Sequence, residues 1–148
     1  MTYKEIVDLL GNISENHYMI ADWGYGQLTD IKTRVEEGRN PNYPYMFINP
    51  VSGTRNGTVL TWTFNLIMME VVGEANDFLA TQSDCQQYLD DVLAHLHIHY
   101  QGPQWPNPVL NVTFTPFKER FQDEVAGMTA VVQMEIPAPL NDCITPIA

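Results

Sequence analysis

Positive charge is scarce in this chain. Among its 148 residues, 7 are Lys or Arg and 18 are Asp or Glu, so the formal net charge is -11 at pH 7 with neutral His. Proteins that hold duplex nucleic acid need an excess of Lys and Arg to displace counterions from the phosphates. The composition therefore argues strongly against a duplex-binding module.

Long apolar runs and cysteines are scarce as well. The sequence has no stretch of about 18 apolar residues, which predicts no membrane-spanning helix, and its N-terminus lacks the apolar core of a signal peptide. Cys85 and Cys143 lie far apart, and without a secretion signal we expect both to be reduced. Hydrophobic residues nevertheless make up 45% of the chain, which is enough for a core. We therefore predict one domain over residues 1–148.

The hydrophobic pattern predicts an α+β fold. Thr2 and Glu5 form a capping box ahead of an apolar stripe with helical spacing, and Thr81 or Ser83 can begin a second helix. An Asn-Gly pair between two alternating segments predicts a hairpin. The predicted segments are an N-terminal helix (1–16), a loop-rich region (17–44), a hairpin (45–73), a helix (81–100), a second hairpin (109–137) and a tail (138–148). This order predicts an antiparallel four-stranded sheet with long hairpins and two helices packed on one face.

The strand expected at 58–72 has two different faces. Its even-numbered positions are apolar except for Glu70. Its odd-numbered positions change along the strand, from Thr61 near the start to Met69 near the end. A half-buried strand keeps one polar face, so we expect the far end to be covered on both faces, either by the fold or by a neighbouring chain.

Three alternating histidines are the strongest candidates for metal chemistry. On a helix, His95 and His99 share a face one turn apart, a spacing that suits two zinc ligands, and Asp91 lies one turn earlier. The alternative is a solvated helix C-terminus, where His interacts favourably with the helix dipole. No Glu follows His95 in the His-Glu-x-x-His arrangement, so no general base is indicated. We expect no metal, no cofactor and no catalytic residue. The alternative function is a small metal-dependent hydrolase that uses His95, His97, His99 and Asp91.

Four stretches of the sequence have a recognisable order. They are residues 43–48 ahead of the long hairpin, a helix begun by Ser83 and Asp84, the Phe-containing segment 116–127, and the Pro-rich, Cys-containing end 136–143. In this order they resemble the tail terminator and tail completion proteins of tailed bacteriophages, in particular a group found in phages of gut Bacteroidetes. The resemblance covers most of the chain from residue 43 onward.

The resemblance implies a structural protein of the virion neck or tail, present in the host cytoplasm during assembly. Family members form homo-oligomeric rings, six-fold or twelve-fold, that join the portal or head connector to the tail. DNA passes through such a ring without specific binding, and the family has no catalytic activity and no membrane contact. Acidic walls repel phosphate, so we hypothesise that acidic side chains line or flank the channel. General solubility charge is the alternative explanation of the acidity.

Basic residues and a hairpin tip are the candidates for subunit contacts. The basic residues could pair with acidic residues of an adjoining subunit, and exposed ion pairs contribute about 0–1 kcal/mol each. Charged residues form only 17% of the chain, below the roughly 25% that is typical, so partners are also expected to cover neutral surface. A monomeric adaptor domain is the remaining alternative. The predicted interface residues are Lys32, Arg34, Arg39, Arg55, Asn56 and Gly57.

Overall fold

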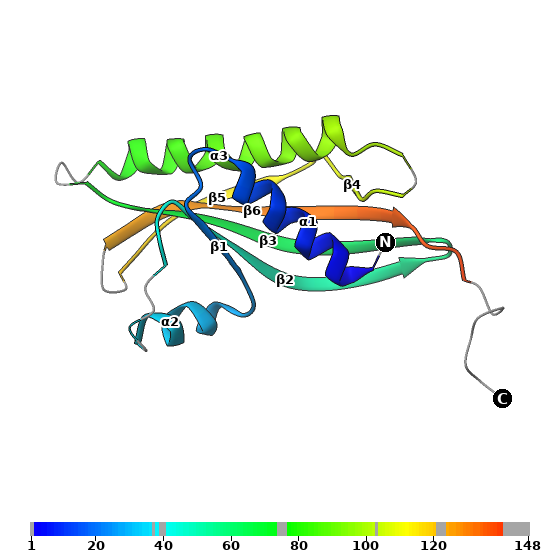
Figure 1. The fold of residues 1–148 in the computed structure, drawn as a ribbon, viewed down its shortest axis with the longest axis horizontal. Helices are drawn as coiled ribbons and strands as arrows, with labels where there is room; N and C mark the ends of the chain where they lie inside the picture. Colours follow the sequence, from blue (N-terminus) through cyan, green and yellow to red (C-terminus); the bar gives the residue numbers. More distant parts are fainter. Residues whose placement is uncertain are drawn as a thin grey trace.

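A curled, six-stranded mixed sheet with three helices forms the fold (Figure 1). The computed structural model describes residues 2–36, 38, 41–73, 77–102, 104–120 and 124–140. Helices α1 and α3 lie on one face of the sheet, and α2 lies on the other side at one end (Figure 1). The helices are α1 (Tyr3–Asn16), α2 (Leu28–Glu36) and α3 (Phe78–His99), and the strands are β1 (Asp22–Tyr25), β2 (Tyr45–Asn56), β3 (Val59–Val71), β4 (Asn107–Pro108), β5 (Thr113–Arg120) and β6 (Glu124–Pro137).

The sheet contains more strands than the sequence predicted, and one of them is parallel. The strand order is β1-β2-β3-β6-β4, and β5 also pairs with β6. Strand β1 runs parallel to β2, whereas all other pairs are antiparallel. The prediction of an antiparallel four-stranded sheet is therefore wrong. Strand β1 has 4 residues and β4 has 2, too few to show an alternating pattern, and both pair with backbone groups that longer strands leave free.

The region 17–44 is more regular than the predicted loop. It contains β1 and the nine-residue helix α2. At the start of α2, Asp30 Oδ2 accepts a hydrogen bond from the backbone N–H of Gln27 at 2.7 Å. The helix buries Ile31, which is 3% exposed. A helix this short has few apolar positions. Its helical periodicity is therefore weak, and the turn-forming residues around it led to the prediction of a loop.

The first helix begins as the sequence predicted. Thr2 Oγ1 accepts from the backbone N–H of Glu5 at 3.2 Å, and Thr2 N donates to Glu5 Oε2 at 2.7 Å. This arrangement confirms the capping box. The buried stripe of α1, which includes Ile6 and Leu10, faces the sheet.

Helix α3 begins earlier than predicted. Its N-cap is Asp77, whose Oδ1 accepts from the backbone N–H of Ala80 at 3.0 Å. The predicted caps, Thr81 and Ser83, lie inside the helix instead. Asp, Thr and Ser are all able to cap a helix. The residue that caps α3 is the one at which the helical backbone begins, which is Asp77.

Strand β3 separates two cores. On one face, Phe64 and Met68 are buried against α1 and α3. On the other face, Ile67 and Met69 are buried in a second cluster that includes Ile31 of α2. The prediction that the far end of this strand is covered on both faces is confirmed for Ile67 and Met69, where the fold itself supplies the cover, whereas Val71 at the last position is 39% exposed.

Candidate functional site

The sheet extends beyond α1 and α3 as an arm, which we define as residues 51–63 together with residues 133–137 (Figure 1). Strand β3 pairs with β2 and β6 along this length. All side chains from 51 to 59 are exposed. Gly57, with φ of 62°, forms the turn at the tip, because primed hairpin turns require a positive φ at their first central residue. The predicted Asn-Gly hairpin is confirmed.

Aromatic packing holds the base of the arm against α1. The Trp62 and Tyr3 ring centroids are 4.7 Å apart, and Tyr3 stacks on Phe64 at 5.9 Å. Gly53 makes room for the indole, since a Cβ there would lie 2.2 Å from the Trp62 ring. The Tyr3 and Tyr25 hydroxyls are 2.7 Å apart. Burial and this hydrogen bond raise the pKa of Tyr3.

On the face of the sheet opposite α1 and α3, the arm and the residues next to it carry uncharged side chains. No described helix lies over this part of the sheet (Figure 1). The register pairs Thr63 with Gln133 and Asn65 with Val131, so these side chains project from one side of the sheet. Glu135, opposite Thr61, is the carboxylate at the edge of this surface. The surface suits contact with another neutral surface, because little charge has to be desolvated. We define the open face as Thr61, Thr63, Asn65, Val131 and Gln133.

Arg34 makes contacts within the chain. Its guanidinium donates to Asp22 Oδ2 at 3.0 Å and lies over the Tyr45 ring, 5.6 Å from the centroid. The backbone N–H of Asn42 donates to the same carboxylate oxygen at 3.3 Å. Asp22 therefore ties α2 and the segment before β2 to β1. A contact of Arg34 with another subunit would have to compete with these interactions.

The other predicted interface residues lie at opposite ends of the sheet. Lys32 is exposed on α2, whereas Arg55 belongs to the part of β2 that lies in the arm. The Arg55 guanidinium donates to the carbonyls of Gly57 and Ala138, which ties the hairpin turn to the segment after β6. Arg39 lies outside the described residues. One chain does not bring these residues together.

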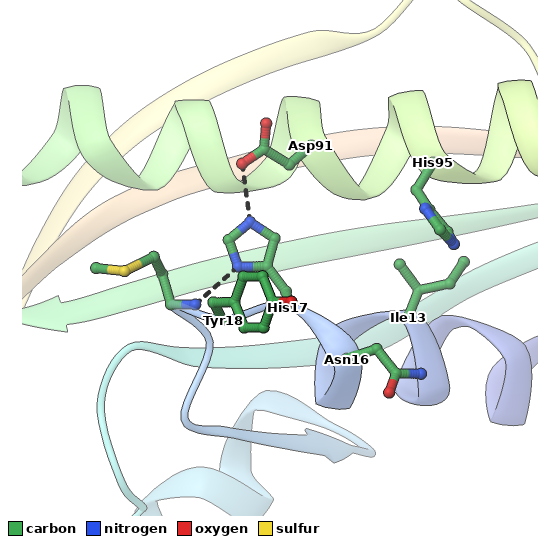
Figure 2. Close-up of a pocket in the computed structure, with 7 residues that line it drawn as sticks. Ile13, Asn16, His17, Tyr18, Asp91 and His95 are labelled. Atoms are coloured by element: carbon green, nitrogen blue, oxygen red, sulfur yellow. Dashed lines mark hydrogen bonds and ion pairs between the residues drawn. The ribbon is translucent and has the colours of Figure 1, made fainter.

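A cavity of about 400 Å³ lies between the C-terminal end of α1 and α3 (Figure 2). His17 Nε2 donates to Asp91 Oδ2 at 2.8 Å, and the backbone N–H of Met19 donates to His17 Nδ1 at 3.0 Å. Because Nδ1 accepts, the hydrogen bonds assign the proton of the neutral ring to Nε2. Sequence spacing does not indicate this pair, because its members are 74 positions apart. The lining residues are Ile13, Asn16, His17, Tyr18, Met19, Asp91 and His95.

The three alternating histidines are exposed at the C-terminal end of α3. The His95 and His99 ring centroids are 4.5 Å apart. Asp91 does not join them, since His17 and the Gln87 amide bind its two oxygens. Within the described part of the chain, no group of three or more His, Cys, Asp or Glu is placed to hold a metal ion. The metal-dependent hydrolase gains no support from this arrangement.

Cys85 lies where the sequence predicted, on the buried face of α3. Its side chain is 0% exposed, and burial, together with the nearby Glu70 and Asp84 carboxylates, raises the pKa of the thiol to about 12. A thiol held in its protonated form is a poor nucleophile. Cys143 lies outside the described residues.

Comparison of the chain with protein families and with curated proteins gives no match. None of the described helices is both long and apolar enough to cross a membrane.

Proposed function

We propose that this protein is a structural subunit of the neck or tail of a tailed bacteriophage. In this proposal the chains form a homo-oligomeric ring, six-fold or twelve-fold, that joins the portal or connector to the tail. DNA passes through the ring without specific binding. The subunit has no catalytic role, and it acts in the virion after assembly in the host cytoplasm.

The observation that carries this proposal is the arm with its open face. Three strands extend beyond α1 and α3 and expose every side chain from 51 to 59. Strands that extend from the core with one uncovered, nearly uncharged face add little buried surface, and therefore little stability, to a monomer. Protein interfaces are depleted in charged residues at their centre, and the open face matches this composition.

The opposite positions of α2 and the arm support a ring over a two-fold dimer. A ring requires a heterologous contact, in which one surface of a subunit meets a different surface of the next. Lys32 and Arg55 mark the two ends of the sheet, so subunits placed end to end would bring both ends into one interface. The overall charge of -11 is consistent with a channel wall that repels phosphate.

Light scattering and negative-stain electron microscopy test the proposal directly. The purified full chain is expected to form closed six-fold or twelve-fold rings with a central channel. A chain that stays monomeric at every concentration, with no rings in the micrographs, contradicts the ring. A ring whose channel wall is strongly basic contradicts the proposed passage of DNA.

A charge variant of the open face tests the interface separately. Thr61→Glu combined with Thr63→Glu places two carboxylates on the open face, which should leave folded monomers because buried unpaired charges are costly. The matched control is Ala80→Glu with Ala94→Glu, which adds the same charge to exposed positions of α3. Rings that survive the first variant would place the interface elsewhere without removing the ring.

A further inference from the structure

Two imidazoles lie close together on the exposed side of α3. His95 and His99 are one helical turn apart, and their ring centroids lie 4.5 Å from each other at an interplanar angle of 37°. When two imidazole nitrogens bind the same metal ion, each at about 2.0–2.1 Å, the centroids of their rings lie at a separation comparable to this one. Little rearrangement of the helix is needed, because the i,i+4 spacing already aligns the two side chains.

The two rings are also available for binding. Both side chains are exposed, and within the described part of the chain neither ring forms a hydrogen bond. His95 touches the edge of Tyr100 at 5.9 Å, and Tyr100 in turn packs on Trp105 at 4.8 Å. These contacts limit the rotation of His95 and therefore reduce the entropy lost when a ligand binds.

The nearby Asp91 carboxylate is negatively charged but is not placed as a third ligand for a metal ion. Asp91 lies one turn before His95, but its oxygens accept hydrogen bonds from His17 and Gln87 at 2.8 and 3.3 Å. No third described His, Cys, Asp or Glu completes a cluster there. An ion bound by the two imidazoles would therefore keep water at its other positions.

We propose that His95 and His99 form a two-imidazole chelate for a late first-row divalent metal ion on the exposed side of α3. Neutral imidazole suits Zn²⁺, Ni²⁺ and Cu²⁺, whereas Mg²⁺ and Ca²⁺ require oxygen ligands. The expected order of affinity is Cu²⁺ above Ni²⁺ and Zn²⁺. The site is independent of the proposed ring and of the arm, because it uses residues of α3 alone.

Calorimetric titration of the full, tag-free chain with Ni²⁺ tests this site. Every sample carries Cys143→Ser, because thiolates also bind such ions. The parent chain is expected to bind one ion, and His95→Ala or His99→Ala should each weaken binding by about 100-fold, since the second contact of a chelate benefits from a high effective concentration.

His97→Ala is the matched control. His97 is equally exposed and lies two residues from both partners, a spacing that places it on another side of the helix. This variant should bind Ni²⁺ with the affinity of the parent chain. An equal loss in all three variants would show a diffuse histidine cluster, and no loss in any of them would place the ion elsewhere. Either result overturns the proposed chelate, as does an absence of binding to the parent chain, while circular dichroism confirms that the variants remain folded.

Discussion

The two ends of one pair of strands differ sharply in their surroundings. The first five residues of β2 are buried, and its last six are exposed. The covered end, which we call the body, lies between α1 and α3 on one face and α2 on the other. The arm has the same strand pairing, but its residues 51–59 are exposed; its cover is limited to the β6 side, where Met134 and Ile136 are buried, and to its base, where Tyr3 packs over Trp62. Strand pairing alone therefore does not make a surface part of the core, and residues 51–59 of the arm stay exposed.

The largest expected effect is a difference in the free energy of unfolding between two substitutions in β3, one in the body and one in the arm. Phe64→Ala should destabilise the protein by about 3–5 kcal/mol, because Phe64 is 0% exposed and its removal leaves a cavity. Val59→Ala in the arm should cost about 0.5 kcal/mol, since Val59 is 36% exposed. Urea unfolding followed by circular dichroism measures both. Equal losses in dilute, monomeric protein would show that the arm is as well packed as the body.

The second prediction concerns the cover that α2 gives the body. Arg34→Ala should cost about 1–3 kcal/mol, because the half-buried Asp22 carboxylate loses a charged donor. Hydrogen exchange should become faster in β1 and at the start of β2. Lys32→Ala, an exposed change on the same helix, is the control and should leave exchange unchanged. If both variants behave alike, the Asp22–Arg34 contact does not hold α2 in place.

A smaller effect is expected at the tip of the arm. Gly57 has φ of 62°, a conformation that costs an L-residue with a side chain about 1–2 kcal/mol, so Gly57→Ala should destabilise the hairpin turn by about 1 kcal/mol. Amide exchange should increase in the arm and stay constant in the body. Gly73→Ala, at a glycine with open space around it, is the control. Faster exchange in the body as well would mean that arm and body unfold as one unit.

The smallest effect concerns Glu70, the acidic exception on the apolar face of β3. Burial and the nearby Asp84 raise its pKa from the usual 4.5. The folded state therefore binds the proton more tightly than the unfolded state, and the wild type loses this contribution as pH rises from 4.5 through the raised pKa. At pH 7, Glu70→Gln should be more stable by less than about 1 kcal/mol, because the side chain is only half-buried and solvent screens much of the effect.

Thermal unfolding from pH 4 to pH 7 measures this difference. The gain of Glu70→Gln should be present at pH 7 and vanish towards pH 4. Glu135→Gln removes an exposed carboxylate of the arm and controls for the change in net charge. A gain that does not depend on pH, or one that Glu135→Gln reproduces, would contradict the assignment to Glu70.

Long periodic segments could be predicted from the sequence, whereas short ones could not. The capping box at Thr2, the hairpin turn at Gly57 and the burial of Cys85 follow from local rules, and the structure confirms them. Strand β1 and helix α2 did not follow from such rules. Each is too short for a periodic signal, and each is stabilised by a partner elsewhere in the chain, such as β2 or Asp22.

The candidate sites divide in the same way. Helical spacing placed His95 and His99 on one side of α3, and the structure brings their rings together. No spacing could indicate that Asp91 pairs with His17, since the two residues are 74 positions apart. The predicted interface set remains a prediction, although Arg34 has an additional role within the fold.

The acidic charge, the two long helices, the long hairpin and the double cover near one end of β3 all follow from the amino-acid sequence. Each of these depends on composition or on the periodicity of neighbouring residues, which physical chemistry translates directly into local structure. Three other features become visible only in the folded chain: α2 supplies the second cover, β1 joins the sheet in parallel, and the arm keeps an open face. These features depend on which distant surfaces meet, and burial gained at such contacts overrides weak local preferences.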